Sequence, residues 1–421
     1  MAYPKWYDET MNAETAQKPL AKPKNLLLAG LIVLLLLAIF SLWNGLESLR
    51  WGWRFDRAKA LLAGHDPEGA YPLLDRCALD NSSSAEAAFL AGRAARMTGR
   101  LDSAKTWLDQ ARGRGWTEVA VEIEQALLGL QAGMVVPYQA FAEKCLEVEQ
   151  PDRPRILEVL TRHHLRRLEL PVARRYAEDW TRAEADNPMA WNQLGTLEFR
   201  SGDNKKAEEA YRKALALDQS STAALEGLAV VLRKLRQSEE ALLLVRKLEE
   251  VAPGRPGLDK LVGACLGDCG QTDQAIVRLR RALADNAADN EAAIELARVL
   301  LATGAPADAR KVLQPVMARA PFDREALEAM AGTLERMGDR DEEAKVRARL
   351  EGVRRDQKSA DAYLAEIGKD PQAIGPRLSL AELLWKNGLK ADASRWAESV
   401  LEIQPTNEAA KAILQKVRPA R

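Results

Sequence analysis

The sequence predicts an all-α protein in which one N-terminal transmembrane helix precedes a solenoid of about ten helix-turn-helix units. Three observations predict this fold. Strong helix formers (Ala, Leu, Arg and Glu) dominate the 421 residues, while aromatic residues make up only 5%. Small residues recur at a fixed period, and an uncharged apolar run lies near the N-terminus. No stretch alternates β-branched and polar residues, so no strand is predicted.

The period is 34 residues, and it appears in several series that share one register. The first series is Ala173, Ala207, Ala241, Ala275 and Ala309; the second is Gly195, Ala229, Gly263, Ala297 and Ala331. A third places glycine at 202, 270, 304 and 338, with Arg236 in the remaining place. A fixed period of this length indicates one stacked helix pair per repeat. We expect the first two series where helices cross closely, and the third where first helices end.

The unit that begins at Trp191 resembles the tetratricopeptide repeat family. The residues that carry the resemblance are Trp191, Leu194, Gly195, Gly202, Asp203, Ala207, Tyr211, Ala214 and Leu215, although Gln219 stands where the family has proline. The resemblance implies a right-handed helical solenoid whose first helices line a concave face that binds other proteins. The whole layout also resembles membrane-anchored bacterial repeat proteins of unassigned role.

The apolar run from Asn25 to Leu46 contains no charged residue. A helix of this length measures about 33 Å, enough for a hydrocarbon core of about 30 Å. Tryptophans follow it as in an interfacial belt: Trp43, Trp51 and Trp53. A cleaved signal peptide is the alternative, but bulky residues stand where cleavage needs small ones. Lys22 and Lys24 beside the run favour a single-pass protein of the inner or plasma membrane with an extracytoplasmic repeat body.

These patterns divide the chain into four parts. We expect an N-terminal tail over 1–24, a transmembrane helix over 25–46, the solenoid over 51–407, and a capping helix with a tail over 408–421. An expanded unit is expected near 324–373, with a charged helix over 340–356 and an extra helix over 359–369.

No motif for catalysis, cofactor binding or metal binding stands out, since the phosphate-binding and hydrolase signatures are missing from the sequence. The 61 basic and 61 acidic residues balance, which argues against nucleic-acid binding. We therefore expect no enzyme activity, cofactor, metal or small-molecule substrate. Cys265 and Cys269 share a helix face and are interpreted as core residues rather than a redox pair or metal ligands. Of His163 and His164, one is expected to pack and one to be solvated.

By repeat register, one set of first-helix side chains is expected to face the concave side: Arg155, Arg162, Arg166, Asn192, Thr196, Arg200, Arg233 and Lys234. Farther along, comparable places hold Glu291, Glu325, Glu328, Glu335 and Glu382, with Arg298, Arg336 and Trp385. The groove is therefore predicted to be basic first and acidic later. It could bind a protein segment of complementary charge, or these residues could be solvated faces of charged helices.

The function that this pattern favours is a membrane-tethered scaffold or adaptor that binds partner proteins, of unknown identity, through the concave groove. The alternative is a structural repeat protein that assembles with itself through its ends or convex face. A monomer in solution would favour the first hypothesis, and concentration-dependent oligomers would favour the second.

Overall fold

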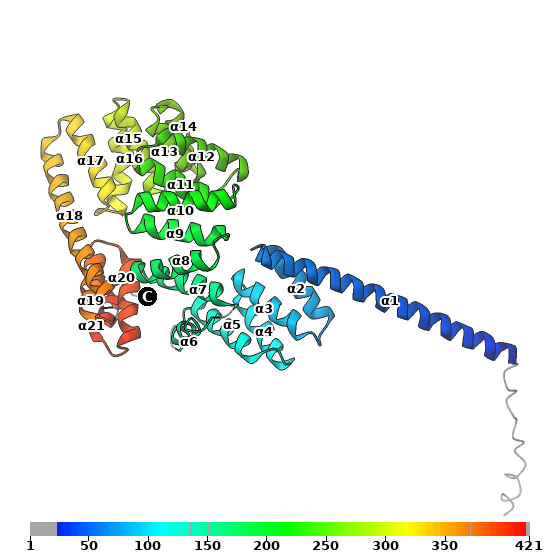
Figure 1. Ribbon diagram of the computed structural model, residues 1–421. Helices are drawn as coiled ribbons and strands as arrows, with labels where there is room; N and C mark the ends of the chain where they lie inside the picture. Colours follow the sequence, from blue (N-terminus) through cyan, green and yellow to red (C-terminus); the bar gives the residue numbers. More distant parts are fainter. Residues whose placement is uncertain (1–22, 135–136, 150, 371, 418–421) are drawn as a thin grey trace, which may run out of the picture. The chain divides into compact units, whose positions relative to one another are not determined.

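The computed structural model describes residues 23–134, 137–149, 151–370 and 372–417. Within these ranges the regular structure is entirely helical, which confirms the all-α prediction (Figure 1). The tail expected over 1–24 lies outside the described residues as far as residue 22, and so do residues 418–421. The chain divides into two compact units, Met1–Leu128 and Gly129–Arg421.

The first unit contains four helices and the start of a fifth: α1 (Pro23–Ala63), α2 (Pro67–Asp80), α3 (Ala85–Met97), α4 (Leu101–Gly113) and α5 (Glu118–Gln131). They share one core, in which Phe55 of α1, Leu74 of α2 and Leu108 of α4 are buried. Asp66 begins α2 by accepting a hydrogen bond from the backbone of Gly69, which satisfies one of the free N–H groups at the helix start.

The prediction of a transmembrane helix over 25–46 is wrong. Among the residues that the structure describes, no helix is long and apolar enough to cross a membrane. The apolar run is not a separate element, because α1 continues unbroken for 41 residues and packs on α2. Trp51, interpreted from sequence as an interfacial residue, instead donates a hydrogen bond to the Cys77 carbonyl at 2.9 Å. The predicted single-pass topology and the predicted extracytoplasmic repeat body both depended on that transmembrane helix, so neither prediction holds.

The second unit continues with helices that pair in chain order: α6 (Tyr138–Cys145), α7 (Arg153–Arg166), α8 (Leu170–Ala183), α9 (Pro188–Arg200), α10 (Asn204–Leu217), α11 (Thr222–Lys234), α12 (Ser238–Val251), α13 (Leu258–Asp268), α14 (Thr272–Asp285), α15 (Asn290–Ala302), α16 (Pro306–Arg319), α17 (Arg324–Met337), α18 (Arg340–Lys369), α19 (Ile374–Lys386), α20 (Lys390–Ile403) and α21 (Glu408–Val417). From α7 onward each odd-numbered helix packs on the next even-numbered one, and each pair packs on the following pair. The odd-numbered helices α9 to α17 also contact one another in a row. We call them the first helices.

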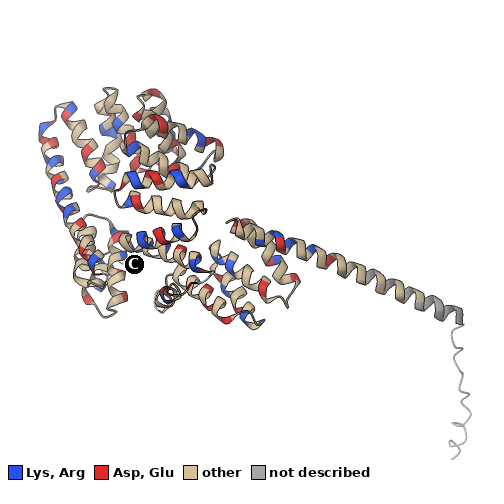
Figure 2. Ribbon diagram, in the orientation of Figure 1, with Lys and Arg blue, Asp and Glu red and all other residues tan. Residues whose placement is uncertain are grey.

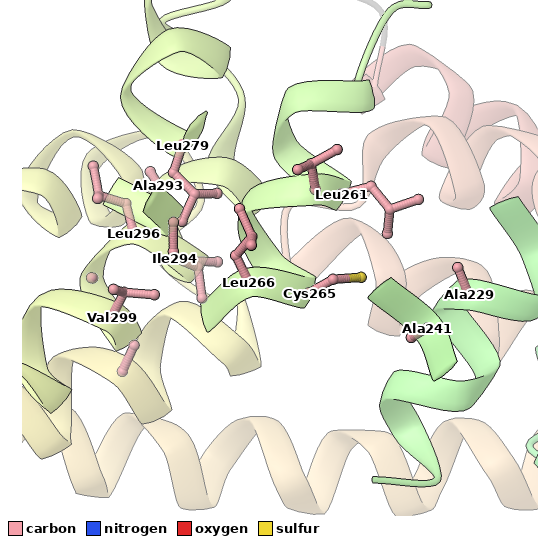
Figure 3. Packing of buried hydrophobic residues seen from close by; sticks show 14 of the residues in the cluster. Ala229, Ala241, Leu261, Cys265, Leu266, Leu279, Ala293, Ile294, Leu296 and Val299 are labelled. Atoms are coloured by element: carbon pink, nitrogen blue, oxygen red, sulfur yellow. The ribbon is translucent and has the colours of Figure 1, made fainter. Parts of the chain in front are cut away.

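Close helix crossings explain the periodic small residues. A Cβ atom added to Gly195 of α9 would lie 2.8 Å from Cδ1 of Tyr211, and one added to Gly227 of α11 would lie 2.4 Å from its Cζ. The ring of Tyr211 on α10 therefore occupies space that only glycine leaves on both neighbours. Ala241 is fully buried in the same core, which Figure 3 shows around Ala229, Ala241 and Cys265. The predicted packing role of Gly195 and Ala241 is confirmed.

The turn after each first helix needs a left-handed residue. Gly202, Gly270 and Gly304 have φ values of 85°, 74° and 78°. Arg236 takes the same conformation with φ of 64°, which costs about 1–2 kcal/mol for a residue with a Cβ atom. The repeat register thus imposes the backbone conformation even where the sequence does not favour it.

The expanded unit differs from its prediction. A single helix, α18, runs through 30 residues where two helices were expected. No glycine or proline lies between Asp356 and Ser359, so nothing interrupts the backbone hydrogen bonds. The Ser359 hydroxyl donates to the Arg355 carbonyl one turn earlier, at 3.2 Å, instead of capping a new helix.

The last helices of the second unit contact the turn between its helices α7 and α8. Leu168, in the turn between α7 and α8, packs against the core of α18 to α21. In the same turn Glu169 accepts a hydrogen bond from Arg377 of α19 at 3.3 Å, and Arg167 pairs with Glu402 of α20. Figure 1 shows these C-terminal helices beside α7 and α8. The row of repeats in this unit is therefore closed by contacts between segments about 200 residues apart in sequence.

Candidate partner-binding groove

A cavity of about 610 Å³ lies on the first helices α11, α13, α15 and α17. We call it the central groove. Its walls are rich in charged side chains: Arg233, Lys234, Arg236, Lys260, Asp268, Glu291, Glu295, Arg298, Arg324, Glu325 and Glu328. An α-helix has about 3.6 residues per turn, so side chains three or four positions apart lie on one face of each helix. Because the repeats share one register, each first helix turns the same face toward the groove.

The charged side chains of the central groove pair across successive helices. Arg233 of α11 contacts Asp268 of α13 at 2.5 Å and Glu295 of α15 at 3.0 Å. Arg298 of α15 contacts Glu325 of α17 at 3.2 Å. Each pair joins one repeat to another, so acids and bases on different first helices hold each other in place. Figure 2 shows Lys and Arg interspersed with Asp and Glu along the helices.

Burial and pairing act in opposite directions on these groups. Burial lowers the pKa of Arg233, but the neighbouring Glu295 and Asp268 raise it by more, so the final pKa lies above its usual value. Burial alone would raise the pKa of Glu325, but Lys234 and Arg298 hold it below the usual carboxyl value. The groove therefore presents ionised groups at neutral pH.

The structure brings only two of the eight predicted site residues, Arg233 and Lys234, into the central groove. From the second predicted set, Glu291, Arg298, Glu325 and Glu328 lie there too. Along this stretch α11 and the turn after it contribute three bases, while α15 and α17 together contribute four glutamates and two arginines, so the charge changes in the predicted direction. The acids and bases also pair with each other across the helices, which the prediction did not include.

The other predicted residues have local roles. Arg155 pairs with Asp152 at 2.8 Å, and Arg162 pairs with Glu158 at 3.0 Å. Arg166 donates to the Leu130 carbonyl at 2.9 Å. The Thr196 hydroxyl lies 3.1 Å from that of Tyr211 and donates to the Asn192 carbonyl, while Arg200 lines a different cavity.

Sequence reasoning missed Asp268, Glu295 and Lys260 as groove residues. Asp268 follows Lys234 by one period of 34 residues, so the register already placed it on this face.

The histidine pair also differs from its prediction. Both His163 and His164 are only 3% exposed, whereas one was expected to be solvated. His164 stacks on Tyr176 and lies 2.6 Å through Nδ1 from a carboxylate oxygen of Glu169. Burial, more than the charges of His164 and Arg167, lowers the pKa of His163 to about 3. Its ring is therefore neutral at physiological pH.

Cys265 behaves as a core residue. Its side chain is fully buried, and burial raises the pKa of the thiol to about 12. A thiol that stays protonated is a poor nucleophile and a poor metal ligand.

Comparison with known proteins identifies the same kind of repeat. Models described as tetratricopeptide repeat match residues 155–321 and 55–118, which together make up more than half of the chain. The chain belongs to the tetratricopeptide repeat family. Its helix pairs, Gly195 and the left-handed turns agree with that membership.

Among curated proteins, "Cellulose synthase operon protein C" of Xanthomonas axonopodis pv. citri (strain 306) is 29% identical over 179 residues. The match covers 41% of this chain but only 12% of that protein. Because the chain spans so little of the relative's length, the activity of the relative is not carried over.

Solved structures with a similar arrangement share little sequence. A human IFIT1 dimer with PPP-AAAA is 17% identical with a TM-score of 0.44, covering 83% of this chain and 89% of that chain. A tetratricopeptide repeat protein from Parabacteroides merdae is 17% identical with a TM-score of 0.39, covering 63% and 99%. MamA from Desulfovibrio magneticus is 22% identical with a TM-score of 0.37, covering 40% and 96%.

Proposed function

We propose that this chain is a non-catalytic scaffold that holds a partner protein in the central groove. The observation that carries the proposal is the cavity of about 610 Å³, into which four successive first helices present charged side chains. Repeat proteins use such continuous faces to bind extended segments.

The charge pattern indicates how the partner would be held. Most groove charges already have a partner within the chain, so a ligand of one charge would have to displace them. Lys234 is one of the accessible charges, since its side chain is 54% exposed and lies 3.5 Å from Glu325. Arg236 and Arg324 are exposed too, and neither forms an ion pair among the described residues. We therefore propose a segment of mixed charge that binds through exposed groups such as Lys234 and leaves the Arg233 pairs intact.

Site-specific photo-crosslinking in cells tests this proposal. A photoreactive residue at Ala302, which is exposed inside the groove, should crosslink to another protein. The matched position Lys247, exposed on α12 and outside the groove, should not. Crosslinks at Lys247 with none at Ala302 would exclude the groove as the binding face.

A second variant makes the test specific. Lys234→Ala should weaken the Ala302 crosslink and leave the free energy of unfolding within about 0.5 kcal/mol, as expected for an exposed side chain. Lys247→Ala is its control. If Ala302 crosslinked only to further copies of this chain, self-assembly would replace partner binding as the function.

A further inference from the structure

A second cavity lies where the row of repeats closes, between the α7–α8 turn and helices α18 to α20. We call it the closure pocket. Its volume is about 350 Å³, within the roughly 300–1,000 Å³ of typical ligand sites. Its walls are mostly apolar: Leu168, Leu170, Val172, Leu364, Ile367 and Trp396. Because the walls come from both ends of the closed row, an open array would not contain this pocket.

Two arginines of the closure pocket are not fully paired within the described residues. Arg200, at the end of α9, is exposed and forms no ion pair among the described residues. Arg174 binds Glu198 at 3.0 Å, but its Nε atom is buried without a hydrogen-bond acceptor in that part of the chain. A buried donor without an acceptor is costly, so the hydrogen-bonding capacity of the Arg174 guanidinium is only partly used.

The acidic residues of the closure pocket do not cancel the charge of its arginines. Glu169 is already bound by His164 at 2.6 Å and by Arg377 at 3.3 Å. Asp361 accepts a hydrogen bond from Gln357 at 3.2 Å, which leaves its negative charge in place. The lining nevertheless holds three arginines against two carboxylates. The pocket thus combines an apolar wall with two guanidinium groups, a pairing that suits a ligand with an apolar tail and one negative charge.

We propose that the closure pocket binds a small amphipathic carboxylic acid, with its tail on Leu364, Ile367 and Trp396 and its carboxylate on Arg200 and Arg174. This site is separate from the central groove and does not depend on the proposed scaffold function. A bound acid would contact both ends of the closed row and hold them together.

Isothermal titration calorimetry on the full chain tests the ligand class. Octanoate is the probe, and octylammonium, which has the same tail with a positive charge, is the comparison. We expect octanoate to bind at least about tenfold more tightly. Equal binding of the two, or no binding of octanoate, would overturn the proposal. Tighter binding of a peptide that ends in leucine with a free carboxylate would overturn it too, in favour of a protein C-terminus.

Two variants at exposed positions place the binding. Ala365→Trp should fill the closure pocket and abolish octanoate binding, and Arg200→Ala should weaken it by about tenfold or more. Arg280→Ala removes an exposed arginine of α14 outside the pocket and should change nothing. Because Ala365 and Arg200 are both exposed, neither change removes core packing. Unchanged octanoate binding by Ala365→Trp would show that the acid binds elsewhere.

Discussion

At the scale of single residues, Arg233 is a structural side chain more than a free recognition group. Its side chain is 15% exposed and contacts two carboxylates from the two following first helices. Sequence register placed it on the groove face, but register cannot show whether a neighbouring repeat supplies the counter-charge. That depends on Glu295, which lies 62 residues away in sequence.

Arg233→Ala should therefore destabilise the chain. Glu295 is only 8% exposed, and removing Arg233 leaves it with the Arg298 contact at 3.3 Å. Stripping a buried acceptor of its charged partner costs about 1–3 kcal/mol. Urea denaturation would measure the loss. The double variant Arg233→Ala with Glu295→Gln should recover part of it, and an Arg233→Ala chain as stable as the parent would contradict the pairing.

His163 should make the chain sensitive to acid. Burial holds its pKa at about 3 in the folded chain, against about 6.5 when unfolded. Between these values the unfolded state binds one more proton, so stability is complete above pH 6.5 and falls as the pH drops toward 3. The slope from this one group is about 1.4 kcal/mol per pH unit. Thermal melts from pH 8 to pH 4 would record it.

Glu169 adds a second acid-sensitive step at lower pH. Burial would raise its pKa, but the hydrogen bond from His164 and the charges of Arg167 and Arg377 lower it to about 2. Its stabilising effect is present above the unfolded value of about 4.3 and is lost as the pH falls toward 2.

His163→Leu is the control for the loss of stability that we assign to His163. The variant should flatten the decline in stability between pH 6.5 and 4 relative to the parent. An unchanged profile would mean that His163 is charged or exposed.

At the scale of helices, the 34-residue period predicted most of what the structure shows. It placed Gly195 and Ala241 at close crossings because small residues are required wherever backbones approach. It could not place contacts that break the period. α18 is one such case, since its continuity depends on the absence of a helix breaker near residue 357. The apolar start of α1 is a second case that the period could not predict. Its composition alone did not show that the same helix continues as far as Ala63 and packs on α2.

Ala241→Leu tests the helix contacts directly. Ala241 is fully buried on α12, so a larger side chain should overpack the contact and cost about 1–3 kcal/mol. Repeat arrays are stabilised by nearest-neighbour interfaces, so hydrogen exchange should also rise in α11 and α13. Leu243→Ala, at a 64% exposed position of the same helix, is the matched control. Equal melting of Ala241→Leu and the parent would show that α12 has room that its burial does not indicate.

At the scale of the second unit, closure changes how stability is distributed. In an open solenoid each repeat affects only its neighbours. Here the α7–α8 turn also packs on α18 to α21 through Leu168. No sequence pattern could predict this, because Glu169 and Arg377 belong to units with no shared register. The 30-residue helix α18 joins α17 to α19, and α19 and α20 supply the ion-pair partners of the α7–α8 turn.

Trp396→Ala tests whether that contact couples the two ends. Trp396 is 2% exposed in the core of the last helices, and its ring also lies near the Arg377 guanidinium. Truncating a buried tryptophan costs about 3–5 kcal/mol. The loss should loosen α19 to α21 and, through Leu168 and Glu169, raise hydrogen exchange in α7 and α8. Leu313→Ala, fully buried in α16, removes comparable packing away from the closure and should leave α7 and α8 protected. If Trp396→Ala loosened the last helices while exchange in α7 and α8 stayed at the parent level, the row of repeats would behave as an open array, and the closure pocket would lose one of its walls.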